Sequence, residues 1–202
     1  MLGTILKFVM ILIAAWLMIA IFSASKVLKK QQAEMMENYQ KKQKTFRHID
    51  GELFDATSDE EIKDGIMVHI FDKEDEDFEH LKEHLTEGER VVYTLYQMEI
   101  AVDQGRGSVY QFFNSPSKEY LPYLKDSYLA VGSEKLAELM EKIMALVIQE
   151  QTGKQTKDEL DMDEDAPTFQ SYTYDYMDLT EAEQLNDKIV AYIRAHREDF
   201  LN

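Results

Sequence analysis

The chain has 202 residues, of which 45% are hydrophobic and 11% aromatic, so it has enough apolar material to fold around a core. It contains no cysteine, which excludes disulfides, thiolate nucleophiles and zinc–thiolate sites. The formal net charge is −17, a sign that argues against direct binding to nucleic acid because carboxylates repel phosphates.

The charge is divided unevenly along the chain. Residues 1–47 carry eight basic and two acidic side chains, a balance of +6, whereas residues 48–202 carry 14 basic and 37 acidic side chains, a balance of −23. An asymmetry of this size indicates an acidic domain that interacts with a basic partner. The alternative is that the negative charge only keeps the domain soluble.

An apolar stretch occupies residues 2–25 and is interrupted only by Lys7. As a helix it would be about 36 Å long, enough to cross a hydrocarbon core of about 30 Å, so it predicts an anchor in the lipid bilayer. Small residues at 23–25 keep a cleaved signal peptide open as the alternative. Because the basic residues follow the stretch, the positive-inside rule predicts a single-pass cell-membrane protein with its acidic domain in the cytoplasm.

Residues 26–50 contain one thin apolar stripe and no Pro or Gly, which predicts a basic linker helix. The stripe, over residues 28–46, has heptad-like spacing. It allows a structural membrane protein that oligomerises through this helix, although a solvated spacer helix fits the pattern better.

The acidic domain, residues 51–202, begins with two capping-box patterns. Ser58 with Glu61 predicts a helix over residues 59–71, and Thr86 with Glu89 predicts another that ends near Gln104. An aromatic segment at 110–113 follows. The domain then continues with a helix that Gly132 ends, a strongly amphipathic helix from Ser133, a polar loop over 151–167 and a last helix from about Thr180.

No segment alternates convincingly with period two, so the fold class is predicted to be all-α. We expect five to six helices in the acidic domain. The predicted division of the chain is an anchor over 1–25, a linker over 26–50 and the acidic domain over 51–202.

Two motifs resemble metal sites. His80, Glu83 and His84 have the H-x-x-E-H spacing of inverted zinc peptidases, which keeps a zinc-dependent hydrolase open as an alternative, but no third ligand is recognisable. The acidic run at 161–165 imitates the start of a calcium loop but lacks the glycine and the closing glutamate. The sequence therefore predicts no enzyme, no catalytic or metal-binding residue and no cofactor.

Three runs resemble the bacterial DNA-mimic protein family over about residues 85–200: MEIAVDQGRGSVYQFFN from Met98, LKDSYLAVGSEKLAELMEKIMALV from Leu124, and VAYIRAHREDF from Val190. The turn at residues 105–107 departs from the paired glycines of the family. The matching positions, which have the character of turn and core residues, are Gly107, Gln111, Phe112, Phe113, Asn114, Gly132, Tyr192, Ile193, His196 and Phe200.

The resemblance implies an acidic helical domain, with a homodimer left open, whose carboxylates imitate DNA phosphates and occupy a basic DNA-binding protein. The leading hypothesis is therefore a membrane-anchored, non-enzymatic interaction module that binds a basic protein and no nucleic acid directly. The candidate contact residues are two acidic clusters: Asp72, Glu74, Asp75, Glu76, Asp77 and Glu79, and Asp158, Glu159, Asp161, Asp163, Glu164 and Asp165.

Overall fold

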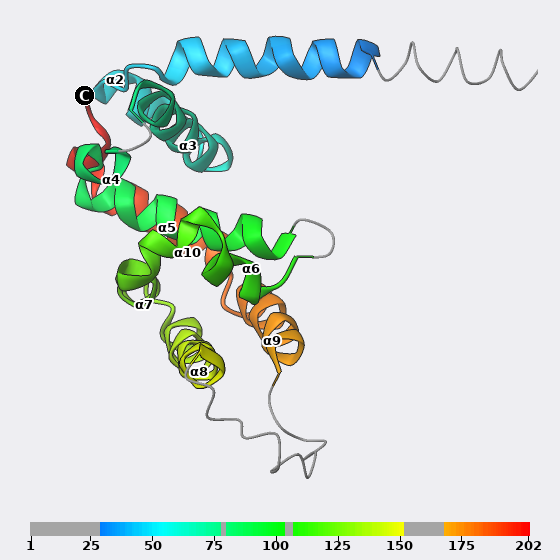
Figure 1. Cartoon of the computed structure of the whole chain (residues 1–202). Helices are drawn as coiled ribbons and strands as arrows, with labels where there is room; N and C mark the ends of the chain where they lie inside the picture. Colours follow the sequence, from blue (N-terminus) through cyan, green and yellow to red (C-terminus); the bar gives the residue numbers. More distant parts are fainter. Residues whose placement is uncertain (1–28, 78–79, 104–106, 152–167) are drawn as a thin grey trace, which may run out of the picture. The chain divides into compact units, whose positions relative to one another are not determined.

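The computed structural model of the chain describes residues 29–77, 80–103, 107–151 and 168–202 (Figure 1). Contacts along the backbone divide the chain into two units, Met1–Thr45 and Phe46–Asn202. In the first unit, residues 29–45 are helical, and Met35 and Tyr39 of the apolar stripe are exposed. Oligomerisation through this helix and the predicted division at residues 25 and 50 stay predictions.

The prediction of a transmembrane helix, and with it of a single-pass location in the cell membrane, is corrected here. Among the described residues, no helix combines the length and the apolar character that a bilayer crossing requires. The apolar stretch that suggested the anchor, residues 2–25, lies outside the described residues.

The all-α prediction is confirmed, since the described part of the second unit contains helices and no strand. Figure 1 shows these helices in chain order. Their bounds are α2 Gly51–Ala56, α3 Asp59–Glu76, α4 Leu81–His84, α5 Glu87–Asp103, α6 Val109–Asn114, α7 Leu121–Ala130, α8 Glu134–Gln151, α9 Phe169–Ala182 and α10 Leu185–Ala195, with 3-10 turns η1 Pro116–Tyr120 and η2 Arg197–Phe200.

The described part of residues 51–202 forms nine α-helices, so the prediction of five to six was too low, and several helix boundaries also differ from the predicted ones. The helix predicted over 59–71 is α3 and runs on to Glu76, and Ser58 makes no capping hydrogen bond through its side chain. The last helix, predicted from about Thr180, is instead two helices. They are separated at Gln184, whose φ of 52° is left-handed and therefore interrupts a right-handed helix.

The hydrophobic core is built around α5, which packs against α3, α6 and α7. Val92, Leu95 and Met98 recur at helical spacing along α5, and each is fully buried. The isoleucines at 62, 66 and 70 bury the facing side of α3 in the same way. The apolar periodicity of the sequence therefore accounts for the face that each of these two helices presents to the core.

A buried polar cluster joins α3 to the start of α5. The Glu89 carboxylate is 1% exposed and accepts hydrogen bonds from Lys73 Nζ at 2.7 and 2.8 Å and from the Thr86 amide at 2.9 Å. Thr86 Oγ1 in turn accepts from the Glu89 amide at 3.2 Å, which completes the predicted capping box. The ring of His69 also lies beside this carboxylate, with Nε2 3.4 Å from Glu89 Oε1.

These contacts determine the protonation of Glu89. Burial by itself would raise the pKa of its carboxyl group, but His69, Lys73 and the Thr86 amide outweigh burial, so the pKa lies below its usual value of 4.5. Glu89 is therefore a buried carboxylate that stays ionised because its neighbours stabilise the charge.

Gly132 ends α7 in the left-handed conformation, with φ of +77°. The Gly132 amide donates to Leu129 O at 3.0 Å and the Ser133 amide to Tyr128 O at 2.7 Å, which is the Schellman arrangement. A Cβ at position 132 would meet no atom within 4 Å, so only the backbone conformation disfavours a side chain.

Gly132→Ala should therefore cost about 1–2 kcal/mol of stability, measured by urea unfolding. Unchanged stability would contradict this account of the turn.

Candidate functional site

α9 presents an acidic face whose carboxylates form no ion pair with any residue that the structure describes. From Thr168 to Ala182 the sequence contains three acidic residues and no Lys, Arg or His. Thr168 and Ser171 form a capping box that starts the helix, and Thr173 and Tyr176 are buried on its inner side. The periodicity of 3.6 residues per turn then places Asp175, Asp178 and Glu181 on the outer side, where all three are exposed.

We name these three residues the α9 acidic strip. Within the part of the chain that the structure describes, none of Asp175, Asp178 and Glu181 forms an ion pair, and their spacing of three residues separates them by about 4.5 Å along the helix axis. Along one strand of DNA the phosphate charges are about 3.4 Å apart in projection on the axis. The strip is therefore a line of negative charge of comparable density.

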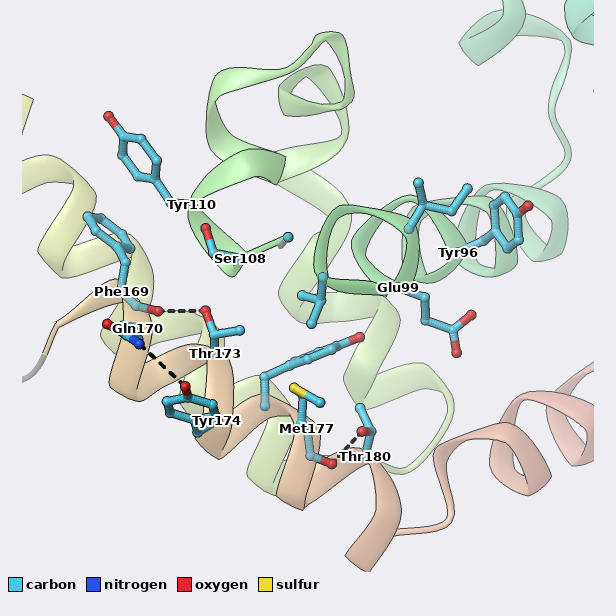
Figure 2. A pocket seen from close by; sticks show the side chains of 14 residues that line it. Tyr96, Glu99, Ser108, Tyr110, Phe169, Gln170, Thr173, Tyr174, Met177 and Thr180 are labelled. Atoms are coloured by element: carbon cyan, nitrogen blue, oxygen red, sulfur yellow. Dashed lines mark hydrogen bonds between the residues drawn. The ribbon is translucent and has the colours of Figure 1, made fainter. Parts of the chain in front are cut away.

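A groove of about 1090 Å³ runs beside the strip, between α5 and α9. Figure 2 shows lining residues of α9 on one side and Tyr96 and Glu99 of α5 on the other. Residues at the start of α6 complete the wall. The aromatic and methionine side chains that line the groove are Tyr96, Tyr110, Phe169, Tyr174, Tyr176 and Met177.

Packing contacts between α6 and α9 form one end of the groove. The Tyr110 and Phe169 rings lie 4.7 Å apart between centroids. The Val109 amide donates to Thr173 Oγ1 at 3.2 Å. Thr173 Oγ1 in turn donates to Phe169 O at 2.6 Å, as Figure 2 shows. These contacts fix one end of α9 against α6, so the groove is bounded by packed helices.

Glu99 is the acidic residue in the wall of the groove, and a single lysine neutralises its charge. Lys63 Nζ donates to both carboxylate oxygens, at 3.0 and 2.8 Å, and also to Asn186 Oδ1 at 3.2 Å. Lys63 belongs to α3 and Asn186 to α10, so this pair connects three helices. We therefore assign it a structural role, with no free carboxylate for chemistry.

The buried Tyr128 hydroxyl donates to that of Tyr176 at 3.2 Å, behind the groove. Burial is the largest cause that raises the pKa of each phenol. Both groups therefore stay protonated at neutral pH and have no acid–base role there.

The first predicted acidic cluster is partly engaged within the domain. Glu74 is half-buried; burial raises the pKa of its carboxyl group, although a hydrogen bond with Tyr93 opposes the shift. Asp77 lies between two histidines, 3.0 Å from His80 Nδ1 and 3.6 Å from His84 Nε2. Asp72 is also half-buried and Asp75 is exposed.

The remaining predicted contact residues have side chains outside the described part of the structure. The side chain of Glu76, all of Glu79 and the whole second cluster, residues 158–165, lie outside the described part. The role of both clusters in binding therefore stays a prediction.

The two histidines of the alternative zinc site lie beside the carboxylate of Asp77. His80 and His84 both face Asp77, and Asp77 raises the pKa of His80 by hydrogen bonding, as expected of a local ion pair. Over the described residues, no group of three or more His, Asp or Glu side chains is arranged to hold a metal ion. The structure thus adds no observation in favour of the hydrolase.

The family-matching positions lie in the core and at turns. Phe112, Phe113, Tyr192, Ile193 and Phe200 are buried. Gln111 is exposed, and the exposed Asn114 donates from Nδ2 to Tyr110 O at 3.1 Å.

The other matching positions follow from local geometry. The His196 ring stacks on Tyr192 at 4.0 Å. At Gly107 a Cβ would lie 2.2 Å from the carbonyl oxygen of Ala101, so the close approach of α5 to this turn requires glycine.

The fold and this surface define an acidic all-α domain with an apolar groove beside a strip of carboxylates that form no ion pair with described residues. The sequence model of the DMP19-like protein family matches residues 83–196, more than half of the chain and both walls of the groove. The chain therefore belongs to the DMP19-like family. No curated protein and no solved structure matches the chain.

Sequence reasoning missed the α9 acidic strip and the groove because it assigned no helix to residues 168–179. A usable signal was present: Phe169, Thr173, Tyr176 and Thr180 recur at intervals of four, three and four, which is helical spacing. The same periodicity would have placed the three acids together on the opposite side.

Proposed function

We propose that the acidic domain is a non-enzymatic interaction module that binds a basic nucleic-acid-binding protein by DNA mimicry. The observation that carries this proposal is the α9 acidic strip, three exposed carboxylates without a basic partner among the described residues. Membership of the DMP19-like family supports the same conclusion. A protein that binds phosphates through Lys and Arg would meet at α9 a row of charges of the same sign and similar spacing.

The electrostatics explain why such a module selects its partner. An exposed carboxylate that has no cation nearby keeps its full attraction for a basic partner, whereas one that is already paired must first lose its own cation. The strip is therefore a better docking surface than Asp59 or Asp55, which accept from Arg194 and Arg197 at 2.8 and 3.2 Å.

The proposal predicts that neutralising the strip weakens binding. We expect the triple variant Asp175→Asn, Asp178→Asn, Glu181→Gln to bind a labelled peptide of lysine and arginine about tenfold more weakly than the wild type. Fluorescence anisotropy at low salt measures this affinity. The wild-type affinity should itself fall steeply above about 0.1 M salt, because exposed charges are screened within about 10 Å there.

A matched control variant distinguishes the effect of where the carboxylates lie from the effect of the net charge of the domain. Glu60→Gln, Glu61→Gln, Asp126→Asn removes the same number of negative charges from exposed sites on α3 and α7. This control should bind the peptide nearly as tightly as the wild type. Equal weakening of both triple variants would show that total charge alone attracts the peptide, and the role of α9 would then be rejected.

A further inference from the structure

Resting on the function proposed above, we propose that the groove between α5 and α9 seats the apolar face of a basic amphipathic helix of the partner. The basic side chains of that helix lie over the α9 acidic strip. The partner is thereby recognised by apolar pattern as well as by charge.

The first argument is the exposed apolar rim of the groove. Tyr174, Met177 and Tyr110 are 58%, 52% and 41% exposed, and all three line the groove. Large apolar side chains that gather at a concave site, beside charged residues, are typical of an interaction surface. Two of the three belong to α9, the helix that carries the acidic strip.

The second argument is the register of α9. Tyr174, Met177 and Thr180 line the groove, and each is followed directly by one acid of the strip. One residue corresponds to a rotation of about 100° on an α-helix, so the acidic strip runs parallel to the edge of the groove. A bound helix whose apolar and basic faces adjoin would meet both surfaces at once.

The third argument is that several polar groups in the groove already have hydrogen-bond partners. Glu99 is bound by Lys63, Gln170 Nε2 donates to the Tyr174 hydroxyl at 3.3 Å, and Thr180 Oγ1 donates to Met177 O at 2.7 Å (Figure 2). A small polar ligand would have to displace these bonds. The exposed Tyr110, Tyr174 and Met177 side chains favour apolar contact with a ligand instead.

Charge complementarity selects the occupant. A second copy of this chain, with a net charge of −17, would bring like charges to the acidic strip, and so would an anionic lipid surface. A basic amphipathic helix brings the opposite charge together with the apolar face that fills the groove.

The test compares two peptides of the same composition of lysine, arginine and leucine, each about 18 residues or five helical turns long. One has leucine at helical spacing, and the other has the same residues scrambled so that the apolar face is lost. We expect the full-length wild type to bind the amphipathic peptide about tenfold more tightly than the scrambled one. Tyr174→Ser with Met177→Ser should abolish this preference, because it removes the apolar rim.

Leu129→Ser on α7 is the matched control, since Leu129 is a comparably exposed apolar residue outside the groove. It should keep the tenfold preference. All variants are full-length, so a difference in peptide binding between them is due to the substituted residues and not to residues 1–28. Equal binding of the two peptides by the wild type, or a preference that survives in the Tyr174/Met177 variant, would overturn the inference.

The acidic-strip variant distinguishes this inference from the function on which it rests. If that variant weakens both peptides while the wild type shows no preference between them, the charge interaction stands and the groove inference fails. If the variant binds both peptides as tightly as the wild type, the proposed function fails. A photo-reactive leucine in the amphipathic peptide should cross-link to α5 and α9, and cross-links confined to other helices would also overturn the groove site.

Discussion

Glu89→Ala is expected to lower the free energy of unfolding by about 3–5 kcal/mol, the usual cost of removing one partner from a buried ion pair. The Glu89 side chain is 1% exposed, and its removal would leave Lys73, His69 and the Thr86 amide facing a cavity without their anion. It would also remove half of the capping box of α5. Urea unfolding followed by circular dichroism measures the loss.

Glu87→Ala is the control for this prediction, because Glu87 lies in the same first turn of α5 but is exposed. It should cost no more than about 0.5–1 kcal/mol. Equal losses in the two variants would show that the buried cluster contributes nothing beyond a favourable charge at a helix start.

The pH dependence of the free energy of unfolding, compared between the wild type and Glu89→Ala, provides a second test. The folded pKa of Glu89 is depressed, so its stabilising contribution is present above the ordinary value of 4.5 and is lost as pH falls through the folded pKa. The difference in stability between wild type and Glu89→Ala should therefore narrow on acidification below pH 4.5. A difference in stability that increased below pH 4.5 would contradict the ionised state of Glu89.

Gly107→Ala is expected to cost about 2–3 kcal/mol, because the new methyl group would overlap backbone atoms that cannot move independently. An added Cβ would lie 2.2 Å from Ala101 O and 2.6 Å from Val102 O, both on the last turns of α5. To make room, the start of α6 would have to move away from α5, and with it one wall of the groove. Thermal unfolding measures the change in stability.

Ser108→Ala tests the adjacent position, where the side chain makes no capping hydrogen bond with α6. It should change stability by no more than about 0.5 kcal/mol. If Gly107→Ala were as mild as Ser108→Ala, the close packing of this turn on α5 would be refuted.

Features that depend on local periodicity could be predicted from the sequence. The capping box of Thr86 and Glu89, the buried isoleucines of α3 and the end of α7 at Gly132 follow from residue type and spacing alone. These features are local in sequence, so neighbouring residues determine them.

α9 could not be recognised as easily, because its composition weakens the helical signal. Its aromatic and β-branched residues have low intrinsic helix propensity, and packing of α9 against α6 and α8, with Thr173 and Tyr176 buried, stabilises the helix instead. The membrane anchor was predicted from the apolar length of residues 2–25, their position in the sequence and the basic residues that follow them. No helix in the described ranges is long and apolar enough to cross a membrane.

The binding surface depends on which acids are free, and a sequence counts charges without showing their partners. Asp77 and Glu74 belong to the most acidic run, yet they face His80 and Tyr93. Asp175 and Asp178 attract less notice in the sequence, but they are exposed and form no ion pair with described residues. Tertiary structure therefore decides which carboxylates are available to a partner.

The most direct test of the proposed function is capture of the partner from cells of the host after gentle cross-linking, at low and at high salt. The wild type and the α3/α7 control variant should retain a basic nucleic-acid-binding protein at low salt and lose it at high salt. The Asp175/Asp178/Glu181 variant should fail to retain it at either salt concentration. Recovery of the same proteins by all three forms, or of proteins without a basic nucleic-acid-binding surface, would contradict recognition through α9.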